Sequence, residues 1–353
     1  MDIKKYRQKI DHIDERLISL LNNRAKMSLA IGKVKLKNKK SVFAPEREKE
    51  ILRRLKKLNK GPMPPEALEA IYREVFSSSR SLEKTIKIAY LGPQASFTHL
   101  ASQKKFGSQA QYVSSTNISE VFLKVENGEC DYGVVPIENS IEGAVTHTFD
   151  LFVDSELKIC SQILLEISHN LLSKYSMNQI HKVYSKLEVF GQCRNWLRAK
   201  LPNADLIDVV STTRAAQIAI TEKNAACIAS SLAAKVYNLR IISRDIEDIS
   251  HNITRFLVIS KNDVPRTGKD RTSILFSIKD KVGALHAMLE PFSQQKINLT
   301  KIESRPSKRK AWDYYFFVDF EGHREEKKVK KALTRLEDMC KHLKVLGSYP
   351  VTE

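Results

Sequence analysis

Cysteine is scarce in this chain of 353 residues, and its five cysteines form no recognisable pattern. They are widely spaced, with no CxxC and no Cys/His pairing, so the sequence predicts free thiols in a reducing compartment and no zinc site. Long apolar runs are also missing, and charged residues begin at Asp2, which argues against a membrane span and a signal peptide. We therefore expect a cytoplasmic protein that binds neither a metal nor a membrane.

The short motifs of cofactor and covalent chemistry are absent as well. No GxGxxG follows the first predicted strand and there is no Walker loop, so a nucleotide cofactor is not expected. No GxSxG elbow or Cys/His pair is present, so the sequence does not indicate covalent catalysis.

Positive charge is what the chain has in excess. The formal net charge is +18, and residues 1–85 alone hold 22 Lys and Arg against 11 Asp and Glu. Such an excess suits nucleic acid, an anionic membrane surface or small polyanionic metabolites. The length and the 42% hydrophobic content allow two or three domains, each with its own core.

Three helices are predicted in residues 1–84. The first runs from Ile3 to about Lys37, where apolar residues recur every three or four positions without a proline. At 1.5 Å per residue it would be roughly 50 Å long, too long to bury its apolar stripe in one small domain, so we expect it to pack along a partner chain. Pro45 and Pro65 would open the second and third helices.

Three basic residues lie on this apolar stripe: Arg7, Arg24 and Lys35. Arg24 and Lys35 fall within about 20° of the same helix face. Arg7 and Arg24 are about 26 Å apart along the axis, too far to hold one small molecule together, so Arg7 would serve a site completed by another subunit. Snorkelling side chains are the alternative for each of them.

The stretch from Tyr132 to Asp150 changes character over a few residues. A short apolar strand, Tyr132–Ile137, is followed by polar residues, Gly143 and a helix that begins near Val145. This layout is typical of a ligand site at the edge of an α/β sheet, where helix N–H groups face an anion. A capped helix behind a buried strand is the alternative.

Strands and helices alternate through residues 85–265, which predicts mostly parallel sheets in two lobes with a cleft between them. Polar residues follow several of the strands: Glu138, Asn139, Ser140, Ser185, Gln192, Ser211, Thr212, Thr254 and Arg255. We expect these residues to converge in the cleft, although each alone is more often a helix cap.

The last segment, residues 271–350, has the element order βαββαβ of a ferredoxin-like α+β domain. The predicted elements are four strands and two helices: Thr272–Lys279, Gly283–Gln295, Leu299–Arg305, Trp312–Glu321, Glu325–Cys340 and Lys344–Tyr349. Without further evidence this segment could be an inert appended domain.

The helical segment carries four motifs in order: Arg7-Gln-Lys-Ile-Asp-His-Ile-Asp14, Asn23-Arg24, Gly32-Lys-Val-Lys35 and Ala44-Pro-Glu-Arg47-Glu48. Together they resemble the all-helical chorismate mutases. The resemblance implies substrate contacts by position: Arg7 of the partner, Arg24 and Arg47 on the carboxylates of chorismate, Lys35 and Glu83 at its ether oxygen, Glu48 at its ring hydroxyl, and Ser79 in the same pocket. Ala44 replaces an acidic residue that some members have.

This rearrangement is pericyclic and needs no nucleophile and no proton transfer. Catalysis can come from holding the dianion in a compact conformer and placing donors where negative charge develops on the ether oxygen. Glu83 can donate only when it is protonated, so burial would have to raise its pKa.

Residues 85–265 carry further motifs: Tyr90-Leu-Gly-Pro93, Val135-Pro-Ile-Glu-Asn-Ser140, Val183-Tyr-Ser185, Gln192-Cys193, Ser211-Thr212 and Thr254-Arg-Phe256. They look like the sequential motifs of prephenate dehydratases, which implies a two-lobed fold shaped like bacterial solute-binding proteins. Thr254 would be the catalytic hydroxyl. The other implied roles are carboxylate binding by Arg255, Asn139, Ser140, Ser211 and Thr212, and pocket lining by Glu138, Ser185 and Gln192. Gln94-Ala95-Ser96 stands where this family more usually has an acidic residue, a glycine and a threonine or serine.

The C-terminal segment resembles the phenylalanine-binding ACT domain in two motifs: Gly283-Ala284-Leu285 and Glu303-Ser304-Arg305-Pro306. Glycine permits a close backbone approach at a dimer interface, and a helix N-terminus can receive a carboxylate. The resemblance implies an enzyme of phenylalanine biosynthesis that forms a homodimer or homotetramer. It also implies that L-phenylalanine inhibits this enzyme.

Three alternatives remain at this stage. The charge of the first helices could bind nucleic acid, but the best-placed basic residues lie on the apolar stripe and no aromatic interleaving accompanies them. The lobes could form a non-catalytic metabolite sensor. The helical segment could be an inactive dimerising element in front of a working dehydratase.

Overall fold

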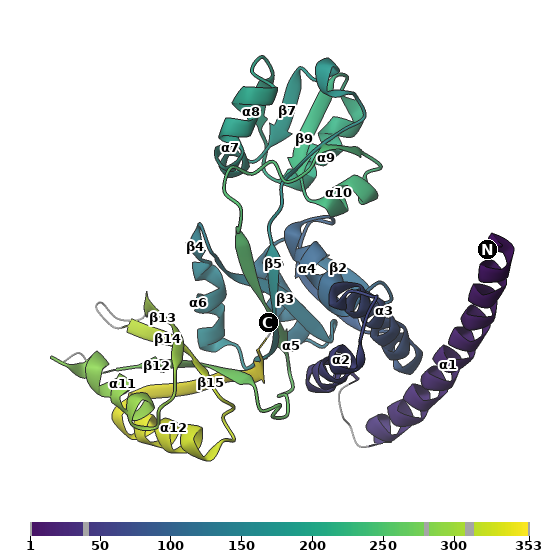
Figure 1. Ribbon diagram of the computed structural model, residues 1–353. Coiled ribbons are helices and arrows are strands. Elements are labelled where there is room, and N and C mark those ends of the chain that lie inside the picture. Colours follow the sequence, from purple (N-terminus) through teal and green to yellow (C-terminus); the bar gives the residue numbers. More distant parts are fainter. Residues whose placement is uncertain (1, 38–41, 279–281, 308–313, 352–353) are drawn as a thin grey trace. The chain divides into compact units, whose positions relative to one another are not determined.

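The computed structural model describes residues 2–37, 42–278, 282–307 and 314–351, and Figure 1 shows its elements. The chain divides into two compact units, which are described separately. The first comprises Met1–Ile86 with Phe106–Gln111, and the second comprises Lys87–Lys105 with Tyr112–Glu353. No helix in these described ranges is both long and apolar enough to cross a membrane.

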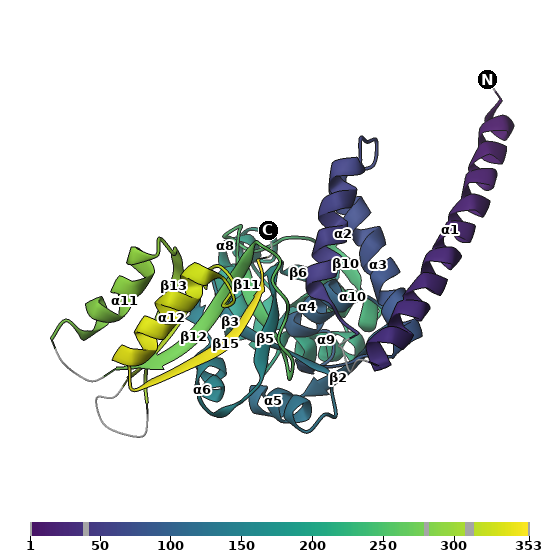
Figure 2. The same cartoon turned by 90° about the horizontal axis from the view of Figure 1, so that it is seen from below.

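The first unit consists of the three predicted helices, α1 (Ile3–Lys37), α2 (Pro45–Leu58) and α3 (Pro65–Glu83). Pro45 and Pro65 each occupy the first turn of their helix, where a missing N–H costs nothing. Of the connection expected at Asn38–Phe43, residues 38–41 lie outside the described part of the chain. All residues from Asp2 to Asn23 are exposed, so the apolar stripe of α1 is uncovered over most of its length. Figure 2 shows α1 as one continuous helix.

The second unit begins with two sheets, one in each lobe. The first lobe has the strand order β2-β1-β3-β11-β5, with β4 paired to β3. Its elements are β1 (Lys87–Leu91), α4 (Phe97–Phe106), β2 (Gln111–Ser115), α5 (Ile118–Glu126), β3 (Tyr132–Asn139), β4 (Gly143–Ala144), α6 (Thr146–Asp154), β5 (Lys158–Glu166) and β11 (Ile253–Ser260).

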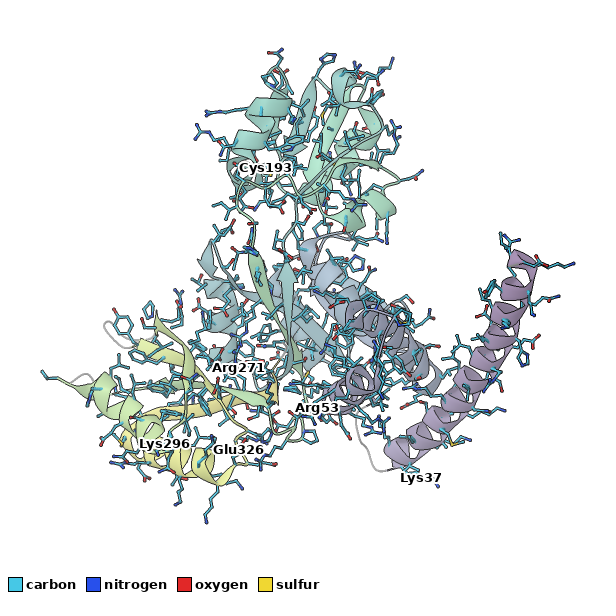
Figure 3. The ribbon with its side chains drawn as sticks, in the orientation of Figure 1. Lys37, Arg53, Cys193, Arg271, Lys296 and Glu326 are labelled. Carbon is cyan, nitrogen blue, oxygen red and sulfur yellow. The ribbon has the colours of Figure 1, made fainter. Side chains whose placement is uncertain are left out.

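The second lobe has the order β10-β6-β9-β7-β8. Its elements are β6 (Asn170–Ser173), η1 (Met177–Gln179), β7 (Lys182–Ser185), α7 (Leu187–Gln192), α8 (Arg194–Lys200), β8 (Asp205–Asp208), α9 (Thr212–Thr221), β9 (Ala225–Ala229), α10 (Ser231–Val236) and β10 (Arg240–Ser243). Cys193, labelled in Figure 3, is fully buried in this lobe, and burial raises the pKa of its thiol to about 12. This thiol therefore stays protonated.

Both sheets are mixed, and the expectation of mostly parallel sheets is wrong. β1 pairs with β3 in parallel, and so does β7 with β8 and β9. β11 runs antiparallel to both β3 and β5, and β6 runs antiparallel to β9 and β10. The reason is that the chain leaves the first lobe through β5 and returns through β11, so the returning strand runs the opposite way.

The C-terminal part has the predicted βαββαβ order, in an antiparallel sheet β13-β14-β12-β15. Its elements are β12 (Asp270–Ser277), α11 (Ala284–Gln294), β13 (Leu299–Pro306), β14 (Tyr314–Glu321), α12 (Lys327–Met339) and β15 (His342–Pro350). Lys279 and Trp312, expected at strand ends, lie outside the described residues. One face of the sheet packs on α11 and α12, and the other contributes Leu275, Phe317 and Leu346 to the core of the first lobe.

Candidate active sites

Two basic residues of α1 meet α3 in the helical unit. The guanidinium of Arg24 donates to the Ser79 hydroxyl at 2.6 Å and lies over the ring of Phe76. Lys35 Nζ lies 3.9 Å from a carboxylate oxygen of Glu83 and donates to the Val42 carbonyl at 2.9 Å. Four of the residues predicted to contact a dianionic substrate are therefore held in two pairs between the same two helices.

Glu83 is buried at the crossing of α1 and α3. Its side chain is 7% exposed, and its Oε2 has no hydrogen-bond partner among the described residues. A Cβ on Gly32 would lie 2.6 Å from Glu83 Cγ, so only glycine at this position leaves room for the carboxyl. Burial raises the pKa of Glu83, against the opposing effect of Lys35 and Arg80. A protonated Glu83 is thus available as a donor at a higher pH than an ordinary carboxyl.

This shift would give the mutase activity that the motifs imply a defined pH dependence. If the protonated form of Glu83 is the active donor, activity is complete below its raised pKa and falls as pH rises through it. In Glu83→Gln the amide donates at every pH, so its activity should fall less steeply as the pH rises. The measurement is kcat/KM for chorismate against pH for both proteins, and superimposable profiles would remove Glu83 as the donor.

Arg80 is a residue of this site that the sequence did not reveal as functional. It is 5% exposed, and its guanidinium donates to Glu48 Oε1 and, at 2.7 Å, to the Phe106 carbonyl. Arg80 therefore orients the carboxylate of Glu48. Its position four residues after Phe76, on the inward face of α3, was the signal available in the sequence.

The other two predicted mutase residues lie apart from this group. Arg47 donates to Glu50 at 2.6 Å on the surface of α2, and both side chains are more than half exposed. Arg7 lies in the exposed half of α1. A single chain therefore brings together Arg24, Lys35, Glu48, Ser79 and Glu83, but neither Arg7 nor Arg47.

In the first lobe, Thr254 on β11 lies directly opposite Asn139 on β3. The Asn139 amide donates to Thr254 Oγ1 at 2.8 Å and to Asn252 Oδ1 at 2.6 Å. Its oxygen accepts from the backbone N–H groups of Ile141 and Glu142, which fixes the orientation of the amide. Within the described part of the chain, the Thr254 hydroxyl accepts this bond and donates none, so its proton is available to a ligand.

The network continues into the second lobe through Gln192. Its side-chain oxygen accepts from Asn252 at 3.4 Å and lies 2.7 Å from His169 Nε2, and its nitrogen donates to Glu142 at 3.1 Å. Gln192 ends α7, whereas His169 and Asn252 lie on the two connections between the lobes. The chain of hydrogen bonds thus links the Thr254 hydroxyl to both connections.

His169 was not predicted as a site residue. It is 2% exposed, and its Nδ1 has no partner in the described ranges. Burial lowers the pKa of His169, so the ring is neutral and its Nε2–H donates to Gln192. A polar Ser168-His-Asn170 run between two apolar strands was the signal that the sequence offered.

Replacement of His169 by phenylalanine should lower by about tenfold the kcat of the dehydratase reaction that the motifs imply, because Gln192 loses the donor that orients the oxygen to which Asn252 also donates. The matched control is His147→Phe, since His147 is exposed and hydrogen-bonds with the Ser119 hydroxyl. The measurement is kcat with prephenate for both variants. Equal rates for His169→Phe and the control would show that His169 has no positioning role.

Glu138 and Arg255 lie on the other face of the same strands. They form the register pair next to Asn139 and Thr254, and successive residues of a strand point to opposite faces. Arg255 is 5% exposed and donates to Glu138 at 2.9 Å and to Asp319 at 2.6 Å. The structure therefore does not bring Arg255 or Glu138 to the pocket face where they were expected.

The predicted hydroxyl residues have local partners. Ser185 is fully buried and donates to the Ile228 carbonyl at 2.9 Å, and Ser211 caps α9 by accepting from Arg214 N–H at 3.0 Å. Thr212 is the first residue of α9. Ser140 accepts from Ile253 N–H at 2.9 Å, beside the Asn139 network. Ser211 is therefore a helix cap in this structure, as the alternative interpretation of the sequence proposed.

The two ACT motifs lie at the start of α11 and at the end of β13. Gly283 precedes α11 with φ of 77°, a left-handed conformation that favours glycine, and Ala284 behind it is buried. Leu285 is 37% exposed. On β13, Glu303 lies 4.0 Å from Lys301, Ser304 is exposed, and Arg305 lies 3.6 Å from Asp150 before the strand ends at Pro306.

Among the residues that the structure describes, no group of three or more His, Cys, Asp or Glu side chains is placed to hold a metal ion. The helical site combines cations with carboxyl groups, whereas the site in the first lobe consists mainly of neutral hydrogen-bonding side chains.

Comparison with known proteins gives three family matches in order along the chain. The type II chorismate mutase model matches residues 6–84, the prephenate dehydratase model residues 88–264 and the ACT domain model residues 272–338. An Aquifex aeolicus protein named bifunctional chorismate mutase/prephenate dehydratase is 50% identical, over 99% of this chain and 98% of its own.

Two further relatives agree with this order. A Pseudomonas aeruginosa protein of the same name is 41% identical, over 99% of this chain and 97% of its own. The crystal structure of an Arthrobacter aurescens prephenate dehydratase in complex with L-Phe superposes with a TM-score of 0.70 at 32% identity, over 75% of this chain and 90% of that one.

Proposed function

The chain belongs to the family of bifunctional chorismate mutase/prephenate dehydratases with an ACT domain, and from this premise we propose which residues perform each reaction and how phenylalanine controls them. It is an enzyme with both activities, so the alternatives of a non-catalytic sensor and of an inactive helical segment are excluded. The N-terminal cations are then accounted for by an anionic substrate.

For the mutase, Arg24 holds one carboxylate of chorismate, and Lys35 with protonated Glu83 donates to the ether oxygen. Arg47 would hold the other carboxylate after it releases Glu50. Negative charge develops on that oxygen as the C–O bond breaks, so donors fixed in advance stabilise the transition state more than the substrate. Glu48, oriented by Arg80, accepts from the ring hydroxyl. The pairing of Lys35 with a buried Glu83 of raised pKa is the observation that supports this assignment.

A second copy of the chain would complete the mutase site. The apolar stripe of α1 is exposed, with Ile10, Leu17 and Leu20 each more than half exposed, which suits a helix that pairs along its length with a copy of itself. Arg7 lies on this stripe and is exposed. We assign it to the site of the partner subunit in a homodimer or homotetramer.

For the dehydratase, Thr254 is the proton donor to the departing ring hydroxyl of prephenate. The bond between the ring and its carboxylate breaks, CO₂ leaves, and the electron pair enters the ring. The ring C–O bond then breaks, and the hydroxyl takes the proton of Thr254 and departs as water, while solvent returns a proton to Thr254. Aromatisation drives this step, so a weak acid held in the correct position is sufficient.

The Asn139–Thr254 hydrogen bond is the observation that supports this assignment. In it the Thr254 oxygen is the acceptor, so the hydroxyl proton stays available to the substrate. Asn139, Ser140 and Gln192 surround it, and Ser211 and Thr212 at the start of α9 would bind a carboxylate from the second lobe.

The ACT domain would bind L-phenylalanine between the Gly283-Ala284-Leu285 and Glu303–Pro306 motifs. The relative from Arthrobacter aurescens was crystallised in complex with L-Phe, and its similarity extends over 75% of this chain. Bound phenylalanine would lower dehydratase activity by favouring one of two states of the cleft. Calorimetry with the wild-type chain tests this directly, and absence of binding heat would end the proposal.

One assay tests both catalytic assignments. Purified protein incubated with chorismate should produce prephenate and then phenylpyruvate, and phenylalanine should slow only the second step. Prephenate that accumulates without phenylpyruvate would contradict the dehydratase, and unchanged chorismate would contradict the mutase.

A further inference from the structure

A buried ion cluster connects the catalytic strands of the dehydratase to the ACT sheet. Arg255 on β11 donates through Nε to Gln162 at 3.0 Å, through Nη1 to Glu138 and to Asp319, and through Nη2 to the Tyr349 hydroxyl at 2.7 Å. Asp319 and Tyr349 belong to strands β14 and β15 of the ACT sheet. Four of the five guanidinium protons are therefore engaged, two of them by the ACT domain.

The surrounding residues complete the cluster. Lys301 of β13 donates to the second oxygen of Glu138, and Ser273 of β12 donates to Asp319 at 2.5 Å. Arg271 of β12, labelled in Figure 3, donates to the same Gln162 oxygen at 3.1 Å. Every strand of the ACT sheet thus contributes a side chain to a cluster centred on one residue of the dehydratase.

The members of the cluster keep fixed charge states. Burial opposes the ionisation of Glu138, but Lys301 and Arg255 lower its pKa, so it remains a carboxylate. Burial raises the pKa of Tyr349 to about 12, so its hydroxyl stays neutral and can accept from Arg255. Arg255 and Asp319 are 5% and 7% exposed, and a buried charge of this kind is tolerated only while its partners are present.

The cluster lies one residue from the Asn139–Thr254 pair on both strands. Glu138 and Arg255 are register partners, Asn139 and Thr254 are the next, and on the other side Phe256 pairs with Pro136, so that Ile137 of β3 is the extra residue of a bulge. A bulge changes the direction in which neighbouring side chains point, so β3 needs an anchor at this position to keep Asn139 aligned with Thr254. The ion pair on one face therefore determines the placement of the hydroxyl on the other.

We propose that Arg255 and Asp319 are positioning residues of the dehydratase, which hold Thr254 against Asn139 without touching prephenate and make the rate depend on the ACT domain. This rests on the proposed catalytic role of Thr254. The assignment replaces the carboxylate-binding role that the sequence suggested for Arg255.

The test compares Asp319→Asn with a matched surface pair. Asp319→Asn should lower the dehydratase kcat by about tenfold and leave KM for prephenate within about twofold, because alignment is lost and no substrate contact is removed. The control is Asp263→Asn, since Asp263 pairs with Arg324 at 2.7 Å where both side chains are about one-third exposed. Its kcat should match that of the wild type, and mutase activity of each variant reports on the helical unit.

Two more variants test the same positioning role if Asp319→Asn folds poorly. Tyr349→Phe removes the hydrogen bonds of the hydroxyl to Arg255 and Ser273, and it should lower kcat by about threefold without a change in KM. In Arg255→Gln, adding Asp319→Asn should cost nothing further, because the two residues act through one contact. An Arg255→Gln variant that raises KM at constant kcat would restore a substrate-binding role and overturn the proposal.

A normal kcat in folded Asp319→Asn would overturn the positioning role while leaving the proposed function intact. Full activity of a folded Thr254→Val variant would instead remove the proposed catalytic hydroxyl, and the positioning argument with it. The two failures are therefore distinguishable.

Discussion

Replacing Thr254 with valine should lower the dehydratase kcat by about 10²- to 10⁴-fold, the range contributed by a positioned acid, and leave mutase activity unchanged. Valine keeps the shape of the side chain but removes the proton that the Asn139 bond leaves available to prephenate. The measurement is phenylpyruvate formation from prephenate, with chorismate consumption measured on the same preparation. A folded variant that retains full dehydratase activity would contradict the assignment.

Thr148→Val is the matched control for this experiment. Thr148 is fully buried in the same lobe, and its hydroxyl donates to the Pro136 carbonyl at 2.6 Å, outside the Asn139 network. Each substitution leaves one buried polar group without its partner, which costs about 1–3 kcal/mol of stability. Similar losses of thermal stability with a large difference in kcat would separate the chemistry of Thr254 from its contribution to the fold.

Local sequence signals predicted the elements well where one period extends over a whole segment. The apolar spacing of Ile3–Lys37, and the prolines at positions 45 and 65, gave helices with the bounds that are observed. The pair Val209-Val210 is typical of a strand, but β8 ends before it, at Asp208, and Val210 is 87% exposed in the loop before α9. Two adjacent valines are an apolar signal, but they carry no information about which neighbour would cover them.

The alternation of side chains along a strand explains why Glu138 and Arg255 lie outside the pocket where they were predicted. Glu138 and Asn139 are adjacent, as are Thr254 and Arg255. The motifs predicted that both residues of each pair face one pocket, although successive side chains of a strand point to opposite faces. Alternation alone could have separated Arg255 from Thr254. Its partner Asp319, however, is 64 residues away on another domain, and only the tertiary structure reveals that contact.

Two buried polar residues of the sites, Arg80 and His169, were not predicted from the sequence, and both bind partners that are distant along the chain. Arg80 binds the Phe106 carbonyl, and His169 binds Gln192, across separations of 26 and 23 residues. A polar residue at a buried position is visible as a break in an apolar pattern, but its role depends on the group that satisfies it. Such breaks are useful indicators of a site, and the partners that define their roles come from the fold.

Replacing Lys35 with methionine should lower the mutase kcat by about 10²- to 10³-fold, because one fixed donor to the ether oxygen is lost. Lys35 lies 3.9 Å from Glu83, whereas Lys33 is exposed on α1, so Lys33→Met is the control and should retain the wild-type rate. Dehydratase activity should be unchanged in both variants. Equal mutase rates for the two variants would exclude Lys35 from the site.

The same variant tests whether the site is shared between two chains. Arg7→Ala should also be nearly inactive as a mutase if Arg7 completes the partner's site. When Lys35→Met and Arg7→Ala chains are unfolded and refolded together, each mixed dimer has one site with both substitutions and one with neither. Random pairing makes about a quarter of all sites intact, so mutase activity should return to about that fraction of the wild-type value. A mixture with no more activity than its separate components would place Arg7 outside the partner's site, because no intact site would then form.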